Sequence, residues 1–333
     1  MKKQSWLMGM TLSAATFMFA GCANDDNTYY SIATASTGGT YYPIGVGMGN
    51  LWTEELMDLG IRATGQSSAG SVENIDLLRK EEAQFGILQG LIADQAYRGI
   101  GIYEGSPYED LRSISMLWSN VEHFVLMNGQ IQSGTISDVE GTSFSIGPQA
   151  SGTEQSTRAL INGIGLSIDD LSPDYLGYDD TISSMRDGRL DGGSLPAGVP
   201  VTAITDMYAS GVRATVLDVT DEQLEAINEV YPVFFRYEIE ANTYPRQEEP
   251  IYTIAQSNVL GVDKHQEAEQ IYLLTKTLFE NLETMYDVHN SAREMSLESA
   301  LVGVSVPLHI GAYEYFIEQG VEIPDELIPP ELD

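Results

Sequence analysis

Three short loops rich in glycine and hydroxyl side chains carry the residues best suited to bind a ligand. They span residues 36–43, 65–74 and 147–154. Each loop follows an apolar, β-branched run and precedes a helical pattern, so each places backbone N–H groups at the start of a helix beside Ser, Thr or Tyr hydroxyls. Such a site holds a small anion without any positively charged side chain. Three of them predict a cleft that binds a small polar ligand from several directions.

The first loop offers both side-chain donors and an accessible backbone. Thr37, Thr40 and Tyr41 would donate hydroxyl hydrogen bonds to a small carboxylate or amino acid. Gly38 and Gly39 would let the backbone approach such a ligand closely, because they carry no side chain. No Arg occurs in any of the three loops. Either neutral donors or one of the flanking residues Arg62 and Arg79 would therefore have to balance the charge of a bound dicarboxylate.

The second loop begins a helix and is followed by a strand end. We expect Ser71 to cap the helix or to donate to the ligand, and Asn74 to reach the cleft. Glu73 fits a first-turn partner of the helix dipole, and it could also accept an ammonium group. Gln89, at the end of the next apolar run, is a candidate polar contact.

The second half of the chain supplies two further groups of candidate ligand-binding residues. Ser151, Gly152 and Thr153 would form an N-terminal nest on the opposite side of the cleft. Backbone groups of a further strand end would come from Ala197, Gly198 and Val199. For every Ser and Thr named, helix capping alone is the alternative interpretation.

Catalytic and metal-binding patterns do not emerge from the chain. Its four histidines show no metal-ligand spacing, and with one cysteine there is no zinc pattern. A nucleophile elbow, a dinucleotide-binding fingerprint and a P-loop are also missing from the sequence. We therefore expect a protein that is not an enzyme and that uses no metal or cofactor. An enzyme on a related scaffold would need a general base or nucleophile with a partner in the cleft.

The first 22 residues have the pattern of an export signal. Lys2 and Lys3 form a positive region, and the apolar stretch 6–20 is too short for a comfortable membrane span. Cys22 follows small residues and resembles the lipidated cysteine of a bacterial lipoprotein, with 23–28 as a polar tether. This predicts an exported protein held on the membrane by a lipid anchor. The alternative is an ordinary secretory signal with an incidental cysteine.

The chain is strongly acidic. It carries 49 Asp and Glu against 16 Lys and Arg, a formal net charge of −33 over 333 residues. Nucleic acid and anionic membrane surfaces are poor partners for this charge. Hydrophobic content of 43% is ordinary, so the chain should fold. Dispersed acidity with few lysines favours a protein adapted to high salt; an acidic exported protein from an ordinary habitat is the alternative.

Strands and helices alternate along the chain, which predicts mainly parallel α/β sheets. The pattern restarts near residue 143, and a long β-rich stretch over 252–262 could return the chain to the first part. We therefore expect one lobe from 29–121 and 250–333, with a second lobe from 122–249 inserted into it, and a ligand cleft between them. Residues 240–250 fit a linker, and 296–301 fits a helix.

Several of these segments together resemble the TAXI family, the solute receptors of one branch of TRAP transporters. The resemblance covers nearly all of residues 28–320 in the same order. It rests on the segments 37–43, 71–74, 146–154, 187–191, 197–200 and 306–313. It implies a two-lobed fold like that of type II periplasmic binding proteins. It also implies delivery of a small organic anion or amino acid, glutamate-like by preference, to an ion-gradient-driven TRAP permease. A ligand-sensing periplasmic domain that serves a signalling partner is the alternative.

Overall fold

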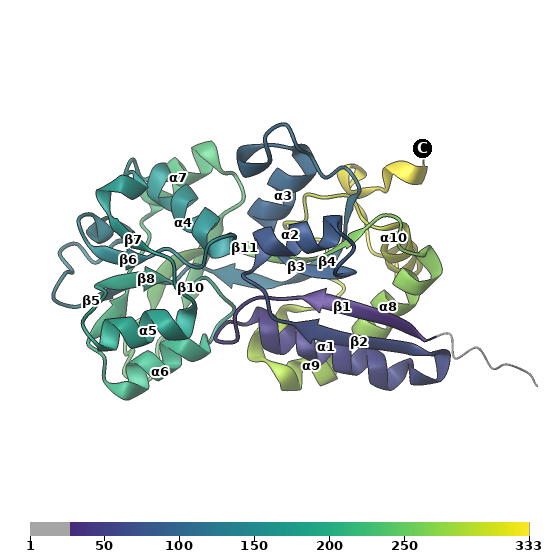
Figure 1. The fold of residues 1–333 in the computed structure, drawn as a ribbon, viewed down its shortest axis with the longest axis horizontal. Coiled ribbons are helices and arrows are strands. Elements are labelled where there is room, and N and C mark those ends of the chain that lie inside the picture. The colour runs from purple at the N-terminus through teal and green to yellow at the C-terminus, as the bar shows by residue number, and fades with distance from the viewer. Residues whose placement is uncertain (1–26, 333) are drawn as a thin grey trace, which may run out of the picture.

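The computed structural model describes residues 27–332, which form two α/β lobes lying side by side (Figure 1). Each lobe is built on its own sheet, with helices on both faces. This mixed architecture with two sheets confirms the predicted fold class. Cys22 and the export signal 1–22 lie outside the described residues. None of the helices in the described part of the chain combines the length and the apolar composition that a membrane crossing requires.

The sheet of the first lobe places three loops at one edge. Its strands are β1 (Thr28–Ala33), β2 (Ile61–Gln66), β3 (Phe85–Gln89), β4 (Leu111–Val121), β10 (Phe235–Ile239) and β11 (Ile251–Asp263). The order is β10-β11-β3-β1-β2, and β4 pairs with β11. Because β1 runs parallel to both β2 and β3, the carboxyl ends of these strands meet at the same edge.

Helices of the first lobe begin at that edge or pack on the sheet from outside. They are α1 (Tyr41–Glu55), α2 (Ser71–Arg79), α3 (Gly90–Arg98), α8 (Ala268–Glu280), α9 (Leu282–Val288) and α10 (Ile310–Glu318). The glycines of α1 serve close packing, as their place in a helical pattern predicts. A Cβ on Gly49 would lie 3.0 Å from the Cα of Thr64 in β2. The neighbouring Trp52 is fully buried and donates to the carbonyl oxygen of Leu274 at 3.0 Å.

The second lobe has a five-stranded sheet of order β7-β6-β8-β5-β9. Its strands are β5 (Phe124–Met127), β6 (Ser143–Ser145), β7 (Ser172–Asp174), β8 (Gly192–Ser194) and β9 (Ala214–Val216). Its helices are α4 (Gly152–Gly163), α5 (Tyr178–Arg186), α6 (Thr202–Ser210) and α7 (Asp221–Val230). Strands β6 and β8 are parallel, so α4, which follows β6, begins at the carboxyl edge of this sheet.

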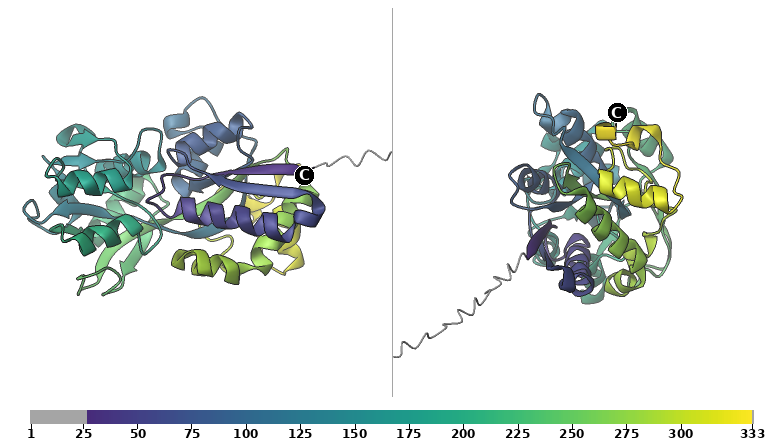
Figure 2. Two further views of the ribbon diagram at one scale, coloured as in Figure 1. Left: turned by 60° about the horizontal axis from the view of Figure 1, so that its bottom comes forward. Right: turned by 90° about the vertical axis from the view of Figure 1, so that its right-hand side faces the viewer.

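Two long antiparallel strands run from one lobe toward the other. β11 pairs with β10 through its first residues and with β3 through its last, and β4 pairs with it along most of its length. β4 ends at Val121, and β5 of the second sheet begins at Phe124. Figure 2 shows the lobes joined by this pair of strands. These two paired strands therefore connect the sheet of the first lobe to the second lobe.

Three expectations for the secondary structure were wrong or incomplete. Residues 296–301 form turns rather than a helix. Helix α7 and strand β10 were not anticipated. The sequence does carry a signal for α7, because Thr220 and Gln223 form a capping box at its start. The segment 240–250 is not a loose linker, because Tyr244 is buried. Its hydroxyl accepts from the backbone N–H of Val201 at 3.1 Å and lies 2.8 Å from Nε2 of His123.

Candidate ligand-binding cleft

Helix starts from both lobes meet around a small cavity between the lobes. α2 and α3 of the first lobe begin at this cavity, and so does α4 of the second. The cavity has a volume of about 30 Å³. Its wall contains six of the residues predicted from the sequence: Tyr41, Ser71, Gln89, Ser151, Gly152 and Thr153. None of the residues lining it carries a charged side chain.

Ser71 and Gln89 are held together on the wall of the first lobe. Gly70, with φ of +127°, is the residue before α2, so Ser71 is the first helical residue rather than the cap. The Ser71 hydroxyl oxygen accepts from the backbone N–H of Gln89 at 3.0 Å. The side-chain Oε1 of Gln89 is buried and has no hydrogen-bond partner among residues 27–332. It is therefore a polar group directed at the cavity without a protein partner.

Ser151 caps α4 on the wall of the second lobe. Its Oγ accepts from the backbone N–H of Glu154 at 3.0 Å and donates to the carbonyl oxygen of Pro148 at 2.6 Å. The first N–H groups of a helix have no acceptor within that helix. Gly152 and Thr153 carry these groups where α4 meets the cavity. The N-terminal end of α4 therefore offers backbone donors and a partial positive charge.

The two lobes are in contact across the cavity. The backbone N–H of Glu73 in α2 donates to the carbonyl oxygen of Ala150 at 3.0 Å. The Thr40 hydroxyl donates to the carbonyl oxygen of Gly198 at 3.2 Å. Both bonds join the first lobe to the second, so the structure describes a closed arrangement. One water molecule needs roughly 10–15 Å³ of such a cavity, so an amino acid could enter only if the lobes parted.

Other predicted residues of the first lobe lie beside the cavity rather than on its wall. Thr37 is exposed, Gly38 packs against the carboxylate of Asp179, and Gly39 packs against the ring of Tyr178. The carboxylate of Glu73 accepts from the backbone N–H of Ala69. These groups shape the loops and close the cleft.

Asn74, also predicted to reach the cleft, is buried inside the first lobe. Its amide donates to the carbonyl oxygens of Thr34 at 2.7 Å and Ile87 at 2.8 Å. Its Oδ1 accepts from the hydroxyl of Ser68 at 2.6 Å. Because these bonds join the ends of β1 and β3 to α2, Asn74 positions the second loop.

The segment Ala197, Gly198 and Val199 also lies off the cavity wall. Ala197 exchanges two backbone hydrogen bonds with Val121, at 2.9 and 3.0 Å. The carbonyl oxygen of Gly198 accepts from Thr40, and that of Val199 accepts from the Ser291 hydroxyl at 3.0 Å. This segment therefore connects the second lobe to the first. The backbone groups named here already form hydrogen bonds within the protein.

Tyr178 and Glu122 are two residues at the site that the sequence reasoning missed. The Tyr178 hydroxyl lines the cavity, donates to the carbonyl oxygen of Pro196 at 2.6 Å and lies 3.0 Å from Oγ1 of Thr153. Tyr178 is the first residue of α5, the helix that follows β7. Glu122 and His123 connect β4 to β5. The Glu122 side chain is completely buried, and burial raises its pKa to about 8.

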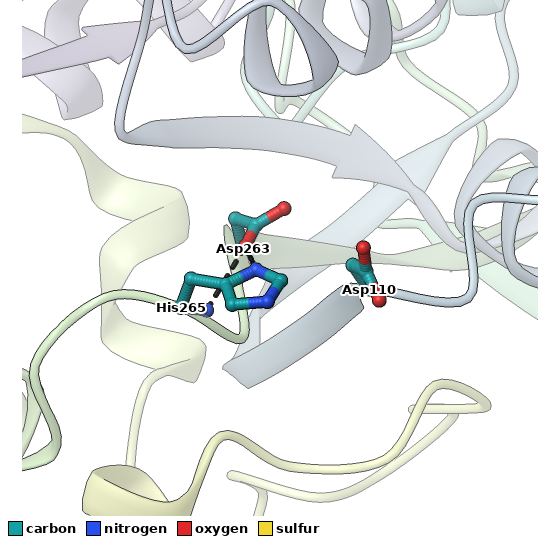
Figure 3. Close-up of side chains that lie close together, drawn as sticks. All are labelled: Asp110, Asp263 and His265. Carbon is teal, nitrogen blue, oxygen red and sulfur yellow. Dashed lines mark hydrogen bonds and ion pairs between the residues drawn. The ribbon is translucent and has the colours of Figure 1, made fainter.

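A separate cluster of side chains with ligating atoms lies at the far ends of β4 and β11 (Figure 3). Nδ1 of His265 is 2.7 Å from Oδ1 of Asp263, whose other oxygen accepts from the hydroxyl of Tyr108 at 2.7 Å. Nζ of Lys264 lies 2.6 Å from Oδ1 of Asp110. The lysine already neutralises this second carboxylate, so the cluster is accounted for as a network of ion pairs and hydrogen bonds.

The α/β fold with two sheets is similar to the folds of two solved structures. A protein from Bordetella bronchiseptica RB50 matches with a TM-score of 0.52 and 13% identity, over 91% of this chain and 85% of the other. A candidate L-cystine ABC transporter from Listeria monocytogenes matches with a TM-score of 0.50 and 9% identity, over 80% and 98% of the two chains. Residues 32–320 match the NMT1-like family. The chain belongs to that family.

Closure of the cleft requires glycine at position 152. A Cβ there would lie 2.7 Å from both Oε1 of Gln89 and Oγ of Ser71, and both of those side chains are buried. We expect Gly152→Ala to hold the lobes apart and to give a larger radius of gyration in small-angle X-ray scattering. Gly177→Ala is the control, because its Cβ would meet nothing closer than 3.9 Å. A Gly152→Ala protein as compact as the wild type would contradict this account.

Proposed function

We propose that this protein is an extracytoplasmic receptor that binds a small organic anion or amino acid, glutamate-like by preference, in the cleft between its lobes. The observation that carries the proposal is the meeting of helix starts from both lobes around a cavity without charged side chains. Backbone N–H groups at helix starts, reinforced by the helix dipoles, bind carboxylates and other anions. The Ser71 hydroxyl, which accepts from the backbone N–H of Gln89, keeps its hydrogen for a ligand and adds a neutral donor.

The lining of the cavity favours binding over catalysis. Acid–base and nucleophilic catalysis need a titratable or activated side chain within reach of the substrate. The cavity wall holds Ser, Thr, Tyr and Gln side chains but no His, Cys, Asp or Glu. Ser71 and Ser151 use their hydroxyls in bonds to backbone groups rather than to a general base. A receptor that releases its ligand unchanged is the function these groups support.

Opening and closing of the lobes is the motion that such a receptor needs. The closed cavity is too small for an amino acid, and few hydrogen bonds join its two walls. The long strands β4 and β11 continue from one lobe toward the other. Bending of these two strands at the point where they pass between the lobes would separate α2 from α4. The core of each lobe would stay intact, as in other hinged two-domain proteins. We propose that the ligand replaces water between the two helix starts and stabilises the closed arrangement.

The partner we propose is a TRAP-type permease in the cytoplasmic membrane. The support is the ordered set of TAXI-like segments along residues 28–320. A lipid anchor at Cys22 would hold the receptor near that permease. The name of the Listeria protein links the same fold to transport of an amino acid, although by another transporter class. Anchoring would be tested by mass spectrometry of the N-terminal peptide from native membranes.

A thermal-shift panel tests the ligand class. The panel contains L-glutamate, L-glutamine, other amino acids, C4 dicarboxylates and 2-oxo acids, in high salt. A ligand at a hundredfold excess over its dissociation constant stabilises the native state by about 2.7 kcal/mol. We therefore expect one anion or amino acid to raise the melting temperature by a few degrees. Choline is the cationic control. A shift with choline and with none of the carboxylates would contradict the proposal.

Replacing a hydroxyl at the cavity wall should weaken binding of the ligand found in this way. Ser151→Ala removes the side-chain cap that fixes the first turn of α4 beside the cavity, and such a cap contributes about 1 kcal/mol. We expect about fivefold weaker binding by isothermal titration calorimetry. Ser167→Ala is the matched control, because Ser167 also caps a helix of the second lobe but does not line the cavity. Equal affinities in all three proteins would place the ligand elsewhere.

A further inference from the structure

Glu122 is a completely buried acid at the point where the chain passes from β4 to β5. Neither of its carboxyl oxygens has a hydrogen-bond partner within the described residues 27–332. The side chains of Gln256 on β11 and Ser156 on α4 are its nearest hydrogen-bonding groups, and they lower its pKa by less than burial raises it. Nε2 of Gln256 is also buried without a partner, while its Oε1 accepts from the backbone N–H of Leu91 at 3.0 Å. A buried carboxyl group without partners is costly and requires an explanation.

This carboxyl group does not line the cavity but is close enough to act electrostatically on two residues of its wall. Leu91 belongs to the first turn of α3, and Ser156 lies about one turn after the start of α4. Two tyrosines that line the cavity, Tyr41 and Tyr178, lie within electrostatic range of the Glu122 carboxyl group. Burial raises the pKa of the Tyr41 and Tyr178 hydroxyls, and the charge of Glu122 adds to the rise in both. A negative charge on Glu122 would therefore repel an anion bound between the helix starts.

No cation faces Glu122 from the surrounding described elements. On α4, Arg158 pairs with Glu154 at 3.0 Å, and on α3, Arg98 pairs with Asp94 at 3.4 Å. The titratable groups that do face it are the two tyrosine hydroxyls, which are neutral at physiological pH.

The neighbouring His123 does not supply a positive charge either. Burial lowers the pKa of its imidazole to about 4. Its two ring nitrogens are engaged by the carbonyl oxygen of Val121 and the hydroxyl of Tyr244, both at 2.8 Å. A carboxylate in this place would be buried without a counter-charge, which favours the neutral acid.

We propose that Glu122 is a specificity-determining residue beneath the cleft, which stays an uncharged acid while the cleft holds an anion and weakens anion binding when it ionises. The inference rests on the proposed function, because it concerns the ligand of the same cavity. Like charges separated by one or two helical turns in a protein interior repel enough to change affinity by about tenfold. The ligand class is then an anion, and at a pH where Glu122 is ionised its binding adds a proton to that carboxyl group.

The opposite charge pattern would identify a different ligand. If the helix starts kept Glu122 ionised, its carboxylate and the unpartnered Oε1 of Gln89 would both accept hydrogen bonds. An ammonium group near them would then favour the ionised form and release a proton on binding. The direction of proton movement therefore separates the two cases.

Calorimetry on the wild-type protein measures this direction. Heats of binding are compared in two buffers of different ionisation enthalpy at pH 6 and pH 8, with L-glutamate, succinate and acetate as probes. Because burial raises the pKa of Glu122 to about 8, we expect no proton exchange at pH 6 and uptake of about half a proton per anion at pH 8. Glu122→Gln should abolish the uptake, and Glu294→Gln, at a partly buried acid away from the cavity, should not. Binding without proton uptake at pH 8, or with proton release, would overturn the inference.

Stability against pH is measured without any ligand and keeps the inference separate from the proposed function. The pKa of Glu122 in the folded state lies above its value of 4.5 in the unfolded chain. Its contribution to stability is therefore complete below pH 4.5 and is lost as the pH rises to about 8. We expect the urea midpoint of the wild type to fall relative to that of Glu122→Gln across this range. If no probe binds, the proposed function fails. Parallel stability profiles would overturn the neutral-acid assignment even where a ligand does bind.

Discussion

The close approach of two helix starts, α2 from one lobe and α4 from the other, is the contact on which the site depends. The backbone N–H of Glu73 reaches the carbonyl oxygen of Ala150 at 3.0 Å. Such an approach leaves no room for a side chain at Gly152, and Gly70, with φ of +127°, lies on the other side of the contact. The partial positive charge of both helix starts then faces one small space. The proposed preference for an anion follows from this arrangement of backbone groups.

The interior around the cleft is polar but carries no fixed cation among the residues described. Donors and acceptors such as Gln89, Gln256 and Glu122 leave buried atoms without a partner. In a protein interior each such atom costs about 1–3 kcal/mol unless water or a ligand satisfies it. These atoms gather where the lobes meet, so a ligand bound there can form hydrogen bonds with them. For the same reason, the charge state of Glu122 affects the affinity for a ligand in the cavity.

Much of this fold and part of the site could be predicted from the sequence. Alternating strands and helices predicted the two-sheet α/β class, and the position of Ser71, Gln89 and Ser151 at strand ends or helix starts placed them on the cavity wall. The predictions were less successful where a residue type can either bind a ligand or form hydrogen bonds inside the protein. Asn74 looks like a ligand donor, but its amide is consumed by backbone carbonyls. Glu122 gave no local signal, because its role depends on what packs against it from other elements.

The central claim, that the helix starts hold the ligand, is tested most directly by a ¹⁵N–¹H NMR titration with the carboxylate or amino acid that stabilises the protein. A hydrogen bond to an anion moves an amide proton downfield. The account predicts that the largest downfield shifts occur at the backbone amides of Gly152 and Thr153 in α4, with further shifts at the start of α2. Shifts confined to the surface cluster at Asp110 and Asp263, or spread evenly over the protein, would contradict it.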